Sequence, residues 1–185
     1  MAKVVAKFYK VSYEQFKKDF FDCFTKNEMI TDFGVALDEN GFETEVRKIY
    51  DSIKLPKRGT IGSAGYDFFA PVKIKINPGQ TVKIPTGIRC RIENDWVLKC
   101  YPRSGLGFKY RMQLNNTVGI IDSDYFGADN EGHIMAKITN DTKEGKTIEI
   151  DSGKGFMQWI FVEYGITEDD DADGIRTGGF GSTTK

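Results

Sequence analysis

The sequence predicts a mainly β protein, a barrel or jelly-roll that carries a helical insert near its N-terminus and a flexible arm at its C-terminus. From Ala64 onward, short alternating apolar segments are separated by turn residues, the pattern of antiparallel strands in barrels and sandwiches. Between residues 12 and 53, apolar residues instead recur at helical spacing. The chain has 185 residues and ends in a Gly-rich stretch, which suits one domain over residues 1–185.

Two kinds of periodicity define the N-terminal elements. Residues 4–11 alternate loosely between apolar and polar side chains, which predicts an opening strand. Ser12 and Gln15 then have the spacing of a capping box, and the aromatic residues that follow recur at helical spacing. The same spacing over residues 42–53 predicts a second helix. We assign residues 12–53 as the helical insert.

The remaining strands follow from alternation bounded by turn signals. They are predicted at residues 72–76, 82–84, 88–92, 96–100, 134–139, 146–150 and 156–164. Turn residues such as those at 78–79 and 94–95 separate them. Many short strands with closely spaced turns indicate a barrel or sandwich rather than alternating strands and helices.

Charge and hydropathy narrow the functional classes. The formal net charge is −1, from 26 basic and 27 acidic residues, so no positive footprint for a polymeric nucleic acid is indicated. A small phosphorylated ligand needs only a few cations and stays compatible with this charge. The apolar runs are far shorter than a bilayer span requires, and the first residues lack a secretory signal. We therefore expect a cytoplasmic protein that does not bind membranes.

The three cysteines do not form a recognisable site. Cys23, Cys90 and Cys100 are odd in number and share no CxxC spacing, so neither a disulfide framework nor a zinc site is indicated. Cys90 and Cys100 lie in alternating apolar stretches, which predicts buried, reduced thiols.

Two short segments are more polar than a barrel requires. Asp67 lies between aromatic residues at the start of a predicted strand. It is either a turn or capping carboxylate, or a group that orders water around magnesium. Arg103, Ser104 and Gly105 combine a guanidinium, a hydroxyl and backbone N–H groups, the groups that cradle phosphate oxygens. Ser-Gly turns near an arginine are also common without a ligand, so each segment alone is a weak signal.

Two later segments also allow a functional and a structural interpretation. Asp122 follows an apolar run, where it could accept a proton from an attacking water. Tyr125 follows three residues later and could pack on a sugar, excluding a 2′-hydroxyl. A β-turn with polar residues at its tip explains both equally well. Gln158 is a lone amide in an apolar strand, and a phosphate oxygen or a backbone carbonyl would satisfy it.

The last segment, residues 168–185, is an acidic linker followed by the Gly-rich arm. A disordered tail is the ordinary explanation for such a terminus. Phe180 within the glycine run, with Arg176 before it and Ser182 after it, is unusual for a solvated tail. An arm that closes over a nucleotide would use the ring to stack on a base, and the other two side chains to grip a phosphate.

Taken in order, these five segments resemble the five motifs of the trimeric deoxyuridine triphosphatase (dUTPase) family, over about residues 54–185. The resemblance implies a homotrimer with active sites at subunit interfaces. It also implies hydrolysis of dUTP to dUMP and pyrophosphate with Mg²⁺ on the triphosphate, which lowers dUTP and supplies the dTTP precursor. The helical insert resembles that of phage and Firmicutes-type members, which implies a bacterial or phage-infected host cytosol.

The resemblance also assigns residue roles. Asp122 is the expected general base toward the α-phosphorus, Asp67 is expected to order Mg²⁺ through water, and Gln158 is expected near the α-phosphate. The expected substrate-binding residues are Arg103, Ser104 and Gly105 at the phosphates, Asn116, Gly119, Ile120 and Ile121 in the uracil hairpin, Tyr125 at the deoxyribose, Met135 at the pocket wall, and Arg176, Phe180, Gly181 and Ser182 in the arm.

The chain departs from the family pattern in three places. Residues 126–128 replace the usual Arg-Gly-Glu, residues 153–155 replace Gly-Asp-Arg, and the arm has one residue fewer between its Arg and its Phe. The first two changes are expected to remove ion pairs rather than chemistry. His133, the only histidine, lies beside a stretch longer than usual and is expected to be a surface strand residue.

Two alternatives come from other classes. A dCTP deaminase shares the barrel but needs a carboxylate at the pyrimidine ring, and residues 134–139 contain no acid. A nucleotide-binding regulatory module would instead grip a partner protein, with the Phe-rich insert as the surface. Hydrolysis is favoured because the chain retains Asp122, Tyr125, Arg103 and Phe180 together. Binding of a partner protein at the N-terminal insert is compatible with it.

Overall fold

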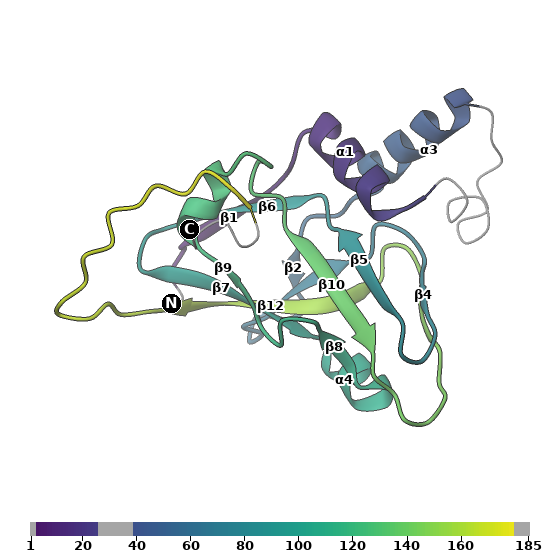
Figure 1. The fold of residues 1–185 in the computed structure, drawn as a ribbon. Helices are drawn as coiled ribbons and strands as arrows, with labels where there is room; N and C mark the ends of the chain where they lie inside the picture. Colours follow the sequence, from purple (N-terminus) through teal and green to yellow (C-terminus); the bar gives the residue numbers. More distant parts are fainter. Residues whose placement is uncertain (1–2, 26–38, 180–185) are drawn as a thin grey trace.

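The computed structural model describes residues 3–25 and 39–179 (Figure 1). In chain order the elements are β1 (Ala6–Lys10), α1 (Tyr13–Cys23), α3 (Glu39–Ser52), β2 (Lys57–Arg58), β3 (Tyr66–Phe69), β4 (Ile74–Ile76), β5 (Thr81–Pro85), β6 (Ile88–Ile92), β7 (Trp96–Pro102), α4 (Ser104–Tyr110), β8 (Met112–Leu114), β9 (Gly119–Ile121), the 3-10 helix η1 (Ser123–Gly127), β10 (Met135–Asn140), β11 (Ile148–Ile150) and β12 (Gly155–Glu163). The mainly β fold with helices near the N-terminus is confirmed.

The strands pair antiparallel in several small sheets around one interior. The largest sheet has the order β2-β3-β12-β7-β9, and smaller sheets pair β5-β10-β8, β1-β6 and β11-β4. The last strand, β12, lies between β3 and β7, so closure of the barrel joins segments far apart in the sequence. Figure 1 shows β12 crossing the middle of the molecule.

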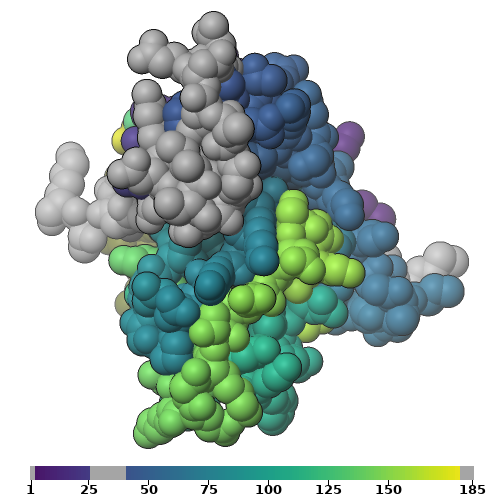
Figure 2. All heavy atoms as spheres, turned by 90° about the vertical axis from the view of Figure 1, so that its right-hand side faces the viewer, coloured from purple at the N-terminus to yellow at the C-terminus, as the bar shows by residue number. Residues whose placement is uncertain are grey.

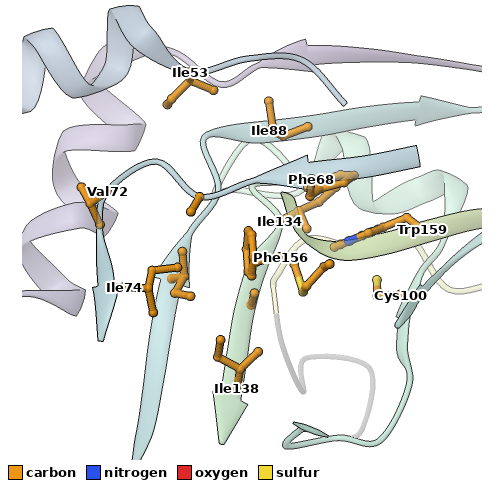
Figure 3. Packing of buried hydrophobic residues seen from close by; sticks show 14 of the residues in the cluster. Ile53, Phe68, Val72, Ile74, Ile88, Cys100, Ile134, Ile138, Phe156 and Trp159 are labelled. Atoms are coloured by element: carbon orange, nitrogen blue, oxygen red, sulfur yellow. The ribbon is translucent and has the colours of Figure 1, made fainter. Parts of the chain in front are cut away.

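The core follows the alternation of the strands. Phe68 of β3 stacks on Trp159 of β12, with ring centroids 4.2 Å apart, and both rings point into the barrel (Figure 3). Cys100 lies close to Trp159, its direct cross-strand partner. Cys90 and Cys100 are free, buried thiols, as predicted. Burial in apolar surroundings raises the pKa of both, so neither is a reactive thiolate.

The helical insert packs its apolar face onto the barrel. The predicted start of α1 is confirmed, because the Ser12 hydroxyl accepts a hydrogen bond from the Gln15 amide N–H at 3.2 Å. Phe16, Phe20 and Val46 are fully buried. Figure 2 shows α3, in blue, above the teal and green atoms of the barrel. Among the described residues, no helix is long and apolar enough to cross a membrane.

One local expectation is wrong, one helix was not predicted, and part of the arm lies outside the described residues. Residues 104–110, which contain two glycines, form the short helix α4, which the sequence analysis did not predict. The expectation of a surface histidine is wrong: His133 is 0% exposed, because its ring is held between the backbone of Gly87 and the carboxylate of Asp19. Phe180, Gly181 and Ser182 of the arm lie outside the described residues.

Candidate active site

A hollow of about 610 Å³ opens beside the turn that joins β8 to β9, the segment predicted as a hairpin, and is called the hairpin hollow here. Its lining residues come from β5, β7, β10 and β12 as well as from the hairpin. The predicted site residues that line it are Asn116, Gly119, Ile120, Ile121 and Met135. The structure therefore brings together the hairpin and wall residues that were expected to surround a uracil ring.

The hairpin gives this hollow a backbone wall. Thr117 has a φ of 62° at the turn, and Gly119 packs so closely that an added Cβ would lie 2.9 Å from the Cys100 sulfur. β9 is the last strand of its sheet among the described elements, so one side of its backbone is free to bond a ligand. Fixed backbone donors and acceptors can distinguish bases that differ only in those groups.

Asp122 follows β9 directly and is bound by the C-terminal arm. The Arg176 guanidinium lies 2.8 Å from one Asp122 carboxylate oxygen and 3.1 Å from a carboxylate oxygen of Asp124. The backbone N–H of Asp129 also donates to the carbonyl of Thr177 at 3.0 Å. Within one chain, the arm thus returns to η1 and neutralises the predicted base, as the path of the yellow segment in Figure 1 shows.

Tyr125 lies under the arm and is anchored by its hydroxyl. The hydroxyl donates to the backbone carbonyl of His133 and accepts from the Asn130 amide, both at 2.8 Å. Burial raises the pKa of Tyr125 above its ordinary value, and the bond from Asn130 opposes this. The residue is 3% exposed, and the Arg176 guanidinium lies 5.7 Å from the ring centroid. Contact between this ring and a sugar therefore requires the arm to move.

A second hollow of about 410 Å³, called the α4 hollow here, lies at the start of α4. Arg103, Ser104 and Gly105 line it, as do Lys154 and Gly155. The sequence analysis did not select Lys154, although its place in a segment that departs from the family pattern was the available signal. Glu149 and Asp151 line it too, so the hollow is polar with mixed charge, and its two cationic side chains beside backbone N–H groups are the ones suited to a phosphate.

Asp67 and Gln158 adjoin this arginine. The Arg103 guanidinium lies 3.3 Å from the Asp67 carboxylate and donates to the Gly155 carbonyl at 3.2 Å. Gln158 is the direct cross-strand partner of Asp67. An added Cβ on Gly65 would lie 2.1 Å from the Gln158 amide nitrogen, so this glycine is required for the amide to fit.

The predicted residues Gln158 and Asp67 lie on the opposite face of the large sheet from the β12 side chains that line the hairpin hollow. Met157 and Trp159 line the hairpin hollow. Because successive side chains of a strand point to opposite faces, Gln158 points to the other face, as does its partner Asp67. The α4 hollow shares no lining residue with the hairpin hollow. One chain does not bring both halves of the predicted site together.

The described acidic residues limit the ways in which this protein could bind a metal ion. No group of three or more His, Cys, Asp or Glu side chains suited to a metal ion occurs among residues 3–25 and 39–179. Asp67 is a single, partly exposed carboxylate beside Arg103. This donor set does not suit a fully protein-bound ion, but it suits Mg²⁺, which retains waters and binds through one carboxylate plus substrate phosphates.

A β-barrel with a backbone-walled apolar hollow and a separate polar hollow that contains Arg103 and Lys154 suits a protein that binds a small, phosphate-bearing ligand. Residues 51–184 match the family model of dUTPase. A deoxyuridine 5′-triphosphate nucleotidohydrolase of Lactococcus lactis is 38% identical over 146 residues, which cover 77% of this chain and 96% of the relative. The chain belongs to the dUTPase family.

Solved structures agree with this assignment. The crystal structure of a dUTPase from Streptococcus mutans has a TM-score of 0.55 and is 35% identical, covering 62% of this chain and 88% of its own. A dUTPase mutant from phage phi11 of S. aureus shares the fold, with a TM-score of 0.53 and 20% identity, covering 65% and 90%. The strand β1 and the helix α1 lie outside the residues that match the family model.

Proposed function

We propose that Asp122 is the general base with which this dUTPase hydrolyses dUTP to dUMP and pyrophosphate. The carboxylate takes a proton from water while the water oxygen attacks the α-phosphorus. The bond from that phosphorus to its bridging oxygen breaks, and pyrophosphate leaves. The observation that carries this proposal is the position of Asp122 at the end of β9, where the hairpin hollow ends and Arg176 orients the carboxylate.

Substrate recognition divides between the two hollows. The hairpin hollow takes uracil through Asn116 and the backbone of Gly119–Ile121, with Met135 at its wall. Tyr125 packs on the deoxyribose once the arm has moved. Arg103, Ser104 and Gly105 bind phosphates, and Gln158 lies near the α-phosphate. The remaining arm residues, Phe180, Gly181 and Ser182, close over the bound nucleotide with Arg176.

A complete site requires more than one copy of the chain. The support is that the two hollows share no lining residue, and that Gln158 and Asp67 point away from the face on which Met157 and Trp159 line the hairpin hollow. A symmetric oligomer solves this by bringing the hairpin hollow of one subunit to the α4 hollow of the next. Ile120, which is 50% exposed at the rim, is suited to such an interface. We propose the homotrimer.

Mg²⁺ completes the charge balance at the triphosphate. Asp67 would hold the ion through water, with the remaining ligands from the phosphates and solvent. When bound, the ion neutralises phosphate charge as the leaving group departs. Arg103, 3.3 Å from Asp67, orients the same carboxylate.

The regulatory-module alternative gains no support from the described part of the insert. Phe16, Phe20, Phe24 and Phe42 are buried against the barrel, so these rings do not form an exposed surface for a partner. The deaminase alternative gains none either, because β10 carries no acid toward the hairpin hollow. Hydrolysis is therefore the function that we propose.

The test is pyrophosphate release from dUTP, dCTP, dTTP and UTP with magnesium, comparing the intact protein with Asp122→Asn. We expect selective hydrolysis of dUTP, and a loss of about 10³-fold or more in the variant. Asp95→Asn, at an exposed turn with a φ of 71° that Asn tolerates, is the matched control and should retain activity. Undiminished hydrolysis by Asp122→Asn would exclude it as the base, and binding of dUTP without hydrolysis by the intact protein would favour the regulatory module.

A further inference from the structure

The helical insert contacts the active-site side of the barrel through Ser12. Its hydroxyl donates to one carboxylate oxygen of Glu131 at 2.6 Å, and its backbone N–H donates to the other at 2.8 Å. The Gln15 side chain does not reach back to Ser12 but donates to Asp19 at 2.8 Å. Glu131, 119 residues away in the sequence, therefore supplies the missing half of the helix cap.

A second polar contact joins the insert to His133. The Nε2 atom of His133 accepts from the backbone N–H of Gly87 at 2.8 Å. The proton of a neutral imidazole must then be on Nδ1, which lies 2.5 Å from the carboxylate of Asp19. The histidine is fully buried, so removal of Asp19 would leave a buried donor without its partner.

Glu131 and His133 belong to a tight loop, residues 128–133, that encloses Tyr125 and is called the η1 loop here. Glu131 and Gly132 both adopt left-handed backbone conformations, with φ of 58° and 66°. An added Cβ on Gly132 would lie 2.5 Å from the backbone oxygen of Tyr125. A left-handed conformation is costly for a non-glycine residue such as Glu131 unless its surroundings hold it, and the two hydrogen bonds from Ser12 to the Glu131 carboxylate supply that hold.

We propose that the insert is a positioning element of the active site, in which Ser12 and Asp19 fix the η1 loop and thereby Tyr125. The route is direct, because the Tyr125 hydroxyl is bonded to the carbonyl of His133, and the His133 ring is bonded to Asp19. A ring that cannot yield excludes a ribose 2′-hydroxyl by contact, whereas a ring that can shift admits it. The insert therefore sets discrimination between dUTP and UTP, an inference that rests on the proposed function.

The test is the ratio of kcat/KM for dUTP to kcat/KM for UTP in Asp19→Ala, Asp19→Asn and Ser12→Ala. A variant that merely loses folded protein loses both activities equally, so the ratio does not change. We expect the ratio to fall about tenfold in Asp19→Ala and about threefold in Ser12→Ala, as expected for the loss of positioning hydrogen bonds. Asp19→Asn keeps an acceptor for His133 and should restore part of the ratio.

Two further variants sharpen the test. Tyr125→Phe removes the hydroxyl at the other end of the route and should lower the ratio in the same way. The double variant with Asp19→Ala should then lose no more than the larger single effect, because both changes break one route. Lys17→Ala is the matched control, since Lys17 lies on the same helix but pairs with Glu14 and Glu43.

The outcomes separate cleanly. A ratio that stays at the wild-type value in Asp19→Ala and Ser12→Ala would overturn the inference and reduce these contacts to docking of the insert. Independent, additive effects of Asp19→Ala and Tyr125→Phe would also overturn it. Absence of dUTP hydrolysis by the unmodified protein would instead contradict the proposed function itself.

Discussion

The η1 side and the α4 side of the chain are built differently. Around η1, Tyr125 and His133 are buried and their polar groups bond within the chain. Around α4, the Arg103 side chain is 46% exposed and its carboxylate partner Asp67 is 24% exposed. On the proposed function, the contrast means that one chain would fix nucleoside selectivity in its interior and leave its phosphate-binding groups accessible to the substrate and a neighbouring copy.

The largest expected effect is on catalytic efficiency and concerns the α4 side. Arg103→Ala should lower kcat/KM for dUTP about 10²- to 10³-fold, because a charged donor to the phosphates is lost. The free energy of unfolding should change by less than about 1 kcal/mol, since the Arg103–Asp67 pair is largely solvent-exposed. Steady-state kinetics and urea unfolding check the two parts, with Lys109→Ala on the same helix as the control. A large loss of stability with little loss of activity would mean that Arg103 serves the fold rather than the substrate.

An intermediate effect is expected on stability and concerns the η1 side. Gly132→Ala should lower the free energy of unfolding by about 3 kcal/mol, because a left-handed backbone and a clash with the Tyr125 backbone oxygen add together. Gly145→Ala is the matched control, with a φ of 70° but no neighbour within 4 Å, and should cost about 1 kcal/mol. Equal shifts of the urea midpoint in both variants would mean that the η1 loop is not tightly packed.

The smallest effect is a pH dependence that belongs to the insert contacts. Burial raises the pKa of Asp19, but bonds from His133 and Gln15 outweigh it and hold the pKa below its usual 3.8. Burial likewise raises the pKa of Glu131, but hydrogen bonds from Ser12 outweigh burial and hold this pKa below its usual 4.5. Carboxyl groups with a lowered folded-state pKa stabilise the fold above their unfolded pKa, and this stabilisation is lost as the pH falls through the folded value.

Urea unfolding at pH 7 and at about pH 3.5 measures this contribution. The combined variant Asp19→Asn with Glu131→Gln should lose less stability on acidification than the unmodified protein, by on the order of 1 kcal/mol. Glu144→Gln is the control, because Glu144 also has a lowered pKa but is fully exposed. An identical acid dependence in the combined variant and the unmodified protein would show that these carboxylates do not hold the insert.

Local sequence patterns predicted most of the fold. Alternation located β4 to β7 and β10 to β12 to within a few residues, because each strand has one buried face. The Ser12 cap located the start of α1. The helix α4 was not predicted because Gly105 and Gly107 lower helix propensity. Contacts with the rest of the fold, rather than its composition, hold this short helix.

The candidate site was predicted in part. The residues expected around uracil do line one hollow, because they are close neighbours along the hairpin. The burial of His133 was not predictable, since its partner Asp19 is 114 residues away in the sequence. Nor could local patterns show that Met157 lines the hairpin hollow while Gln158 points to the other face, because this depends on which strands flank β12.

The bond between Arg176 and Asp122 makes the arm a counter-ion that can be exchanged. In this structure the guanidinium pairs with the carboxylate that we propose as the proton acceptor. A triphosphate carries more negative charge than one carboxylate and would compete for the same guanidinium. On the proposed function, transfer of the arginine to the phosphates would release the carboxylate to bond water, so capture of the nucleotide and activation of the base would be a single exchange of ion pairs.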